Sequence, residues 1–537
     1  MRLKVFSILF ILSLNFLFSQ EKISGVILSD STDLPLENVT IFNSDTNEIS
    51  YSDLNGNFNM TIKNIDSEIN FFLEGFNLVT KLYSPATGDL KNIEIRLIPK
   101  IEELNEVVVR ANLKKIFQIK RMEDVEGTRI FAGKKNEVIL IDVSMANLAS
   151  NNARQIYNQI PGLNIYQNDD AGLQLNIGGR GLNPNRTANF NTRQNNYDIS
   201  ADALGYPESY YTPPPEGLEE IQILRGAASL QYGTQFGGLI NFKIKEPKPE
   251  DKFELITRNT AGSNNLFTNF TSISSSSNKS SYYGYVNYKK GDGFRPNSEF
   301  ESINTFQNFN YDLNEKSKIT GEITYMEYLA HQAGGLSDFM FANDPFQSNR
   351  ERNWFEIKWF LYNLKYLLEI SENSSFSFSF FGLDAKRNSL GFRTNRVDQI
   401  DYGEERDLIK GDFKNFGFES RYLTNHNFFN AKSYLLLGVK YYNSYSQSVQ
   451  GPGSSSKDAN FNFDYVNFPN YVNQSEYNYP NNNLAIFGEN IFYIDEKLSI
   501  TPGFRFENIS TSLDGYYRKI NLDAAGNTIY NERFDEK

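Results

Sequence analysis

Hydrophobic and polar residues alternate along the C-terminal half of this 537-residue chain, from about residue 251 onward. Residues 375–380 read Ser-Phe-Ser-Phe-Ser-Phe, and residues 283–288 and 306–311 alternate in a similar way. Successive side chains of a β-strand point to opposite faces, so each segment predicts a strand with one apolar and one polar face. Many Tyr and Phe residues among Ser and Asn also favour β-structure that is wet on one side.

The connections between these segments differ in length. Residues 313–316, 371–374 and 495–497 are short polar turns, and much longer connections lie between them. In a soluble sandwich the apolar faces would form a core, whereas in an outer-membrane barrel they face lipid. Short turns at one end and long loops at the other are typical of such barrels, as are aromatic residues near the strand ends.

The number of predicted strands indicates how much of a barrel this chain contains. We count about eleven, whereas plugged transporters have about 22 strands. An open half-barrel would expose unpaired strand edges to lipid. We therefore expect residues 248–537 to form the N-terminal part of an antiparallel transmembrane β-barrel, about half of it, in a fragment of a longer gene product.

The N-terminal part shows two further patterns. Residues 1–20 combine basic Arg2 and Lys4 with a short apolar run and then Ser19, which predicts a secretory signal peptide. Short apolar runs separated by turn signals in residues 21–99 predict a small β-sandwich. No later stretch is apolar for long enough to predict a membrane-spanning helix.

A linker and a Gly-rich region follow the predicted sandwich. In residues 100–111, acidic residues precede three valines, which fits an ordinary strand or a strand kept free to pair with another protein by β-augmentation. In residues 112–247, short strands alternate with tight glycine turns, and Ile156, Tyr157 and Ile160 have helical spacing before Pro161-Gly162. We expect a small mixed α/β domain there.

Composition excludes several classes of function. The net charge of −12 argues against a nucleic-acid binder. The chain has no Cys and only two His, His331 and His426, so Cys-ligated or multi-His metal sites are not expected. No nucleophile–base pair or phosphate loop stands out, so we predict that the protein is not an enzyme and needs no cofactor.

Two segments of the Gly-rich region resemble the plug motifs of TonB-dependent outer-membrane receptors. They are LNIGGRGLNPNR at residues 175–186, which is similar to the ferric-citrate-receptor branch, and LEEIQILRGAASLQYGTQFGGLINFKIKEP at residues 218–247. Residues 330–359 and 484–507 resemble barrel segments of the same family. Residues 21–99 resemble the carboxypeptidase-regulatory-like domain that often precedes such receptors, and this name implies no peptidase activity.

The resemblance implies a fold and a mechanism. The chain is expected to be mainly β, with a β-sandwich, a mixed α/β plug domain and a β-barrel in the outer membrane. A ligand would bind from outside, and TonB, energised by ExbB and ExbD, would pair with the linker and displace the plug. The TonB-box-like residues are Leu104, Asn105, Glu106, Val107, Val108 and Val109.

The resemblance also implies roles for single residues of the plug. Arg180 and Arg225 look like plug arginines that meet barrel carboxylates, since a buried Arg must be paired. The alternative is a surface Arg after a strand. The other residues of the motif provide tight turns and close packing rather than ligand contacts: Gly181, Gly226, Tyr232, Gly233, Gly237 and Gly238.

A ferric chelate such as ferric citrate is anionic and needs cationic and hydrogen-bonding partners. The candidates lie after the first plug motif, at the expected plug apex, and near the outer end of one strand: Arg186, Arg193, Gln194, Tyr210, Tyr211 and His331. A solvated loop without ligand contacts remains the alternative for each of them. Other cargo (cobalamin, an oligosaccharide or a peptide) and a secreted β-rich adhesion or scaffold protein stay open as alternative functions.

Overall fold

The structure is a computed structural model. It describes residues 21–62, 67–84, 90–99, 119–141, 148–150, 152, 154–157, 162–167, 169–173, 175–179, 181–225, 230–233, 238–247, 252–394, 396–428, 431–495, 497–523, 525 and 527–537. The chain divides into two compact units, Met1–Asn112 and Leu113–Lys537. The predicted signal peptide and the TonB-box-like residues lie outside the described residues.

The first unit is a β-sandwich. One sheet has the order β4-β1-β7 and the other the order β3-β2-β5-β6. Their alternating buried side chains, such as Ile27, Ile41 and Phe71, form a single apolar core, which confirms the predicted sandwich. The strands are β1 (Glu21–Ser29), β2 (Thr40–Asn43), β3 (Ile49–Tyr51), β4 (Asn57–Ile62), β5 (Ser67–Phe72), β6 (Val79–Tyr83) and β7 (Ile93–Leu97).

The first part of the second unit is the plug. Its main sheet has the order β15-β14-β17-β16-β11-β8, and the hairpins β9-β10 and β12-β13 stand apart from it. The strands are β8 (Ile119–Lys120), β9 (Val125–Glu126), β10 (Arg129–Ile130), β11 (Lys135–Leu140), β12 (Leu163–Gln167), β13 (Leu175–Gly179), β14 (Phe190–Gln194), β15 (Tyr197–Asp198), β16 (Leu218–Arg225) and β17 (Gly238–Ile244). The helices are η1 (Leu148–Ser150), α2 (Arg154–Tyr157), η2 (Asn185–Thr187) and η3 (Pro215–Gly217). This is the mixed α/β domain that the sequence predicts.

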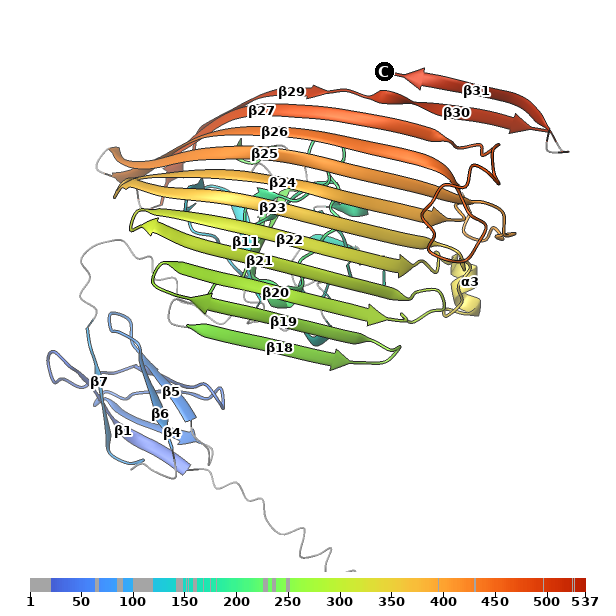
Figure 1. Cartoon of the computed structure of the whole chain (residues 1–537). Helices are drawn as coiled ribbons and strands as arrows, with labels where there is room; N and C mark the ends of the chain where they lie inside the picture. Colours follow the sequence, from blue (N-terminus) through green and yellow to red (C-terminus); the bar gives the residue numbers. More distant parts are fainter. Residues whose placement is uncertain are drawn as a thin grey trace, which may run out of the picture. The chain divides into compact units, whose positions relative to one another are not determined.

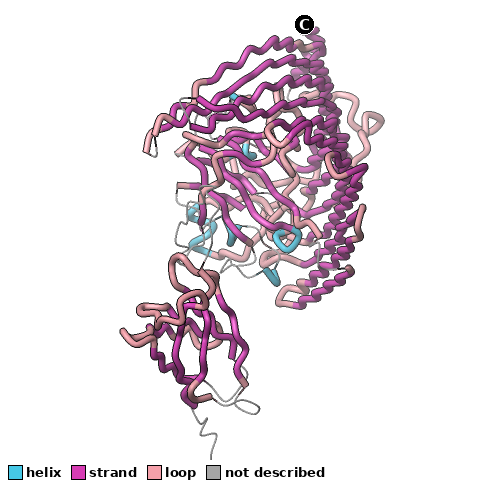
Figure 2. Tube along the Cα trace, turned by 90° about the vertical axis from the view of Figure 1, so that its left-hand side faces the viewer, coloured by secondary structure: helices cyan, strands magenta, loops and turns pink. Residues whose placement is uncertain are grey.

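The rest of the second unit is one antiparallel sheet that curves around the plug (Figures 1 and 2). Its strands are β18 (Phe253–Ala261), β19 (Phe267–Ser276), β20 (Ser280–Gly291), β21 (Phe300–Asn314), β22 (Ser317–His331), β23 (Trp354–Ser371), β24 (Ser374–Gly391), β25 (Arg406–Phe428), β26 (Ala431–Gly453), β27 (Ser475–Tyr493), β28 (Ser499–Ile500), β29 (Gly503–Thr511), β30 (Asp514–Leu522) and β31 (Thr528–Glu536). Among the described residues the sheet has 14 strands, more than the predicted eleven or so, because β28, β29 and β30 each pair with a part of β27. The sheet is not closed, and β18 and β31 are its two edges.

The two faces of this sheet have opposite character. The face toward the plug is polar as well as apolar, with buried Asn308, Glu322 and Ser377. The opposite face exposes large apolar side chains, and Leu364 lies directly across from Phe380 on the next strand. A soluble sheet buries its apolar face, whereas an outer-membrane barrel wall presents it to lipid. The alternation in the sequence thus yields a barrel wall. In the described part of the chain, no helix is long and apolar enough to cross a membrane.

The two ends of the sheet differ as predicted. Short turns join β21 to β22 and β23 to β24, whereas residues 332–353, residues 392–394 with 396–405, and residues 454–474 belong to long loops at the other end. The first of these loops contains α3 (Asp338–Asn343), which Figure 1 shows beyond the strand ends. The long loops therefore lie together at one end of the wall.

Candidate ligand cavity and plug contacts

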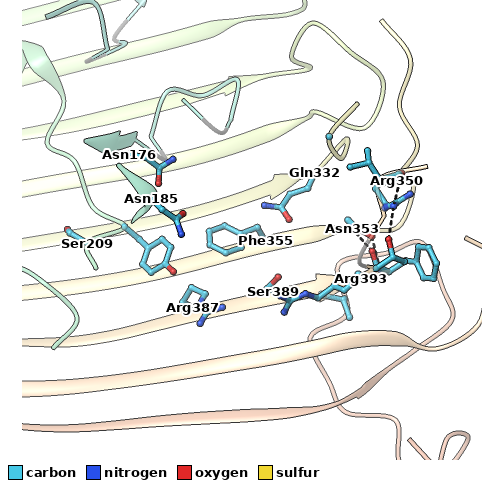
Figure 3. A pocket seen from close by; sticks show the side chains of 17 residues that line it. Asn176, Asn185, Ser209, Gln332, Arg350, Asn353, Phe355, Arg387, Ser389 and Arg393 are labelled. Carbon is cyan, nitrogen blue, oxygen red and sulfur yellow. Dashed lines mark hydrogen bonds between the residues drawn. The ribbon is translucent and has the colours of Figure 1, made fainter. Parts of the chain in front are cut away.

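A cavity of about 480 Å³ lies between the plug and the wall at the long-loop end (Figure 3). The plug contributes Asn176 at β13, Asn185 in η2, and Ser209 with Tyr210. The wall and its loops contribute the remaining side chains, which are Gln332, Arg350, Asn353, Phe355, Arg387, Ser389, Leu390, Phe392, Arg393, Thr394 and Val397, besides Gly335 and Gly391. A ligand in this cavity would touch the plug and the wall at once.

The polar lining has one sign of charge. Arg350, Arg387 and Arg393 line the cavity, and no Asp or Glu belongs to the described lining. The remaining polar groups are amides and hydroxyls, which hydrogen-bond without charge. In a chain with a net charge of −12 this lining is locally cationic, so it favours an anionic ligand that is rich in hydrogen-bond acceptors.

Arg387 is the arginine that connects this cavity to the plug. Its guanidinium lies 5.9 Å from the ring centroid of Tyr210 and donates a 3.3 Å hydrogen bond to the hydroxyl of Tyr206. Burial raises the pKa of the Tyr206 phenol, which therefore stays neutral. Arg387 also lines the cavity, so its guanidinium is placed to meet an anionic ligand there.

A second cavity, of about 630 Å³, shares Gln332, Gly335 and Asn353 with the first. His331 lines it, but both ring nitrogens are engaged, one with the Glu299 carboxylate and one with the backbone carbonyl of Glu351, each at 2.9 Å. The ring also stacks on Trp354 at 4.1 Å. The structure thus makes His331 an anchor of the surrounding loops rather than a direct ligand group.

The long loops above the cavities are tied together by buried arginines. Arg352 forms an ion pair with Asp401 and donates hydrogen bonds to the carbonyls of Glu404 and Ser455. Arg406 donates to the carbonyls of Ser454 and Asp458. Burial raises the pKa of the Asp401 carboxyl, but the hydrogen bonds from Arg352 and the Gly403 backbone, together with the positive charges of Arg352 and Arg350, outweigh burial and hold that pKa below its usual value. The rim of the cavity is therefore preorganised.

A buried ionic cluster joins the plug to the wall deeper in the structure. Arg193 on β14 lies 3.9 Å from the carboxylate of Glu419 on β25, and Arg421 donates to the same carboxylate at 2.6 Å. Both guanidinium groups face the ring of buried Tyr232, at 4.8 and 5.1 Å. Removing the Glu419 carboxylate would break both of these buried pairs at once.

The structure corrects three of the predicted ligand residues. Arg193, Gln194 and Tyr211 are at most 1% exposed and lie between the plug and the wall, not at the plug apex. Gln194 bonds Tyr197, Tyr211 and wall residue Thr324. The physical reason is that β14 lies inside the main plug sheet, so its polar side chains bond the wall. Of the other candidates, Tyr210 lines the first cavity.

The role assigned to Arg225 also needs correction. Its described ion pair, 2.7 Å to Glu137, is with a neighbouring strand of the plug and not with the wall. The reason is the register of the β16–β11 pair, which places Arg225 opposite Lys135 and so close to Glu137. Arg193 makes the contact with a wall carboxylate instead. Arg180, Gly226, Gly237 and the side chain of Arg186 lie outside the described residues.

The described motif glycines adopt backbone conformations that favour glycine. Gly181, Gly233 and Gly238 have φ values of +76°, +95° and +113°. At Gly238 a Cβ would overlap the carbonyl oxygen of Leu224 on the adjacent strand.

The sequence analysis does not identify four residues of the site, which are Arg387, Arg352, Arg406 and Glu419. In the sequence they are marked only as polar positions of an alternating strand or as members of a long loop.

The fold and the cavities define a class of protein, a barrel wall with an internal plug. Residues 142–239 match the family described as TonB-dependent Receptor Plug Domain, and residues 23–109 match the CarboxypepD_reg-like domain. Along the chain, a CarboxypepD_reg-like domain is therefore followed by the plug domain of TonB-dependent receptors. No curated protein matches the sequence.

Several solved structures share the fold. The ferric citrate transporter FecA in its unliganded form is 18% identical, with a TM-score of 0.59 over 75% of this chain and 58% of FecA. The ferric yersiniabactin uptake receptor FyuA from Yersinia pestis is 12% identical (TM-score 0.56; 75% and 60% covered), and the ferric-catecholate import receptor Fiu from E. coli K12 is 11% identical (TM-score 0.56; 77% and 68% covered). The chain thus spans about three fifths of the length of FecA and FyuA.

Proposed function

We propose that this chain belongs to an outer-membrane receptor that takes up an anionic ferric chelate, such as ferric citrate or another siderophore complex, by TonB-dependent transport. The observation that carries the proposal is the cavity lined by Arg350, Arg387 and Arg393, with no Asp or Glu in its described lining. It lies where the plug meets the long loops, so a ligand there is in contact with the element that must move.

The chemistry of the lining supports a chelate rather than a bare metal ion. Within the described residues, no group of three or more His, Cys, Asp and Glu side chains could hold a metal ion. A ferric carboxylate complex instead presents oxygen acceptors and negative charge, which arginine donors recognise. The iron is cargo in this account and its ligands come from the chelator.

Location and energy supply are parts of the same proposal. The apolar outer face of the wall suits the outer membrane, reached through the predicted signal peptide. TonB, with ExbB and ExbD, would pair with residues 104–109 as an added strand, since β-augmentation needs only an extended segment. The fold of FecA, FyuA and Fiu supports this proposal by likeness.

Growth under iron limitation tests the proposed cargo. A strain lacking the gene is complemented with the wild-type gene or with the Arg387→Met variant, and ferric citrate is the sole iron source. The proposal predicts growth with the wild-type gene only, whereas ferrous sulfate supports all strains. Arg396→Met is the matched control, because Arg396 is an exposed loop arginine outside the cavity lining. Equal growth of the deletion strain on ferric citrate would reject this cargo.

A further inference from the structure

Four polar side chains form a continuous hydrogen-bonded chain from the wall of the first cavity into the plug. Arg387 of β24 donates to the hydroxyl of Tyr206 at 3.3 Å, and that hydroxyl lies 2.9 Å from the hydroxyl of Tyr210. Tyr210 in turn donates to the carboxylate of Glu208 at 2.6 Å. Glu208 is only 8% exposed and does not belong to the described lining of the cavity. The chain therefore connects a cavity arginine to a carboxylate that a ligand in the cavity does not touch.

The end groups of this chain determine the direction of every proton in it. A guanidinium can only donate, a carboxylate can only accept, and a phenol has a single proton to give. Because Tyr210 gives its proton to Glu208, its oxygen accepts from the hydroxyl of Tyr206. The proton of Tyr206 is then committed to Tyr210, which leaves the Tyr206 oxygen as the acceptor for Arg387. The carboxylate of Glu208 thus sets the proton order that Arg387 meets.

The two tyrosine rings are held in place by contacts that do not involve Glu208. The ring of Tyr206 stacks on Phe413 of β25, with 5.1 Å between the ring centroids. The ring of Tyr210 packs against Phe355 and Trp359 of β23, at 5.8 and 6.2 Å. Such aromatic contacts fix the rings by packing. The carboxylate is therefore needed for the direction of the hydrogen bonds rather than for the placement of the rings.

We propose that Glu208 is a positioning residue for ligand binding, which acts through Tyr210 and Tyr206 to hold the guanidinium of Arg387 at the cavity. A side chain that is already ordered loses less conformational entropy when a ligand binds. Without the acceptor at Glu208, the proton of Tyr210 is no longer drawn away from Tyr206, and the oxygen of Tyr206 is no longer reserved for Arg387. This inference rests on the proposed function, because it takes Arg387 as an arginine that meets the anionic ligand.

Calorimetric titration of the purified chain with ferric citrate tests the role in binding. Glu208→Met should raise the dissociation constant about 3- to 10-fold, which corresponds to the loss of one hydrogen bond. Glu208→Gln keeps an acceptor oxygen and should bind like the wild type, as should Glu315→Met, at an exposed glutamate in the turn after β21. In the Arg387→Met background, Glu208→Met should cause no further loss. Equal weakening in both backgrounds, or by Gln and Met alike, would overturn the proposal.

A second measurement needs no ligand and so separates this inference from the proposed cargo. Thermal unfolding of the whole chain in detergent is followed by circular dichroism for Glu208→Met, Arg387→Met and the double variant. Residues of one hydrogen-bonded network have non-additive effects on stability. The double variant should therefore lower the unfolding midpoint by less than the sum of the two single shifts, whereas in the Tyr206→Phe background, which lacks the connecting hydroxyl, the shifts should add.

Additive shifts in the wild-type background would overturn the role of Glu208. A wild-type chain that fails to bind ferric citrate would reject the cargo, and the ligand-free measurement would still decide the role of Glu208. If Glu208→Met does not fold, Tyr210→Phe takes its place in both experiments, because it removes the hydroxyl that links Glu208 to Tyr206.

Discussion

Arg193 of the plug lies 3.9 Å from the Glu419 carboxylate of the wall, and both side chains are buried. Arg421 completes the cluster, so one carboxylate offsets two arginines. Glu419→Gln removes the carboxylate that both guanidinium groups share, and breaking a buried pair in this way costs about 3–5 kcal/mol. Denaturant unfolding followed by tryptophan fluorescence should show this loss. Asp398→Asn, at an exposed loop pair, should change the free energy of unfolding by less than about 1 kcal/mol, and equal effects of the two variants would refute the role of Glu419.

Arg387 should dominate recognition of the anion. Its side chain lines the cavity and contacts the plug tyrosines. A hydrogen bond to a charged group contributes about 1.5–3 kcal/mol, so Arg387→Met should weaken ferric citrate binding about 10- to 100-fold. Titration calorimetry of the purified chain measures this change, with Arg396→Met as the control. An unchanged dissociation constant for Arg387→Met would place the ligand elsewhere.

Gly238 should not tolerate a side chain. Its φ is +113°, and a Cβ would overlap the Leu224 carbonyl across the β16–β17 pair. Gly238→Ala should therefore destabilise the protein by more than about 1 kcal/mol. Gly181→Ala is the matched comparison, because Gly181 has a φ of +76° but no described atom lies within 4 Å of the position that a Cβ would take. A larger loss for Gly181→Ala than for Gly238→Ala in thermal unfolding would contradict this explanation.

The Arg352–Asp401 ion pair predicts that the long loops loosen at low pH. Because the pKa of Asp401 is lowered in the folded protein, the stability that its ion pair contributes is fully present above the ordinary pKa of 3.8. It is lost as the pH falls through the lowered folded value. Protease cleavage of the long loops should thus rise below about pH 4, measured with pepsin. In Asp401→Asn this acid-dependent increase should be absent, and a wild-type-like increase in that variant would count against the pair.

The sequence predicted the fold better than the site. Alternation such as that of residues 375–380 predicts a strand and the face of each side chain, because the backbone of a strand points successive side chains to opposite faces. The motif glycines are visible because few residues adopt positive φ. Arg193 was misplaced because a polar residue after a motif looks the same in a loop and in a buried strand. Arg387 was missed because partners 181 residues apart, such as Tyr206, meet only through tertiary packing.

The central claim is energised uptake, and it is tested most directly by deleting residues 104–109 and following radioactive iron supplied as ferric citrate. Cells with the wild-type gene should accumulate iron and lose this ability when the proton gradient is collapsed. Cells with the deletion should bind ferric citrate at the surface at wild-type levels but accumulate none. Accumulation that is unchanged by the deletion would contradict the account.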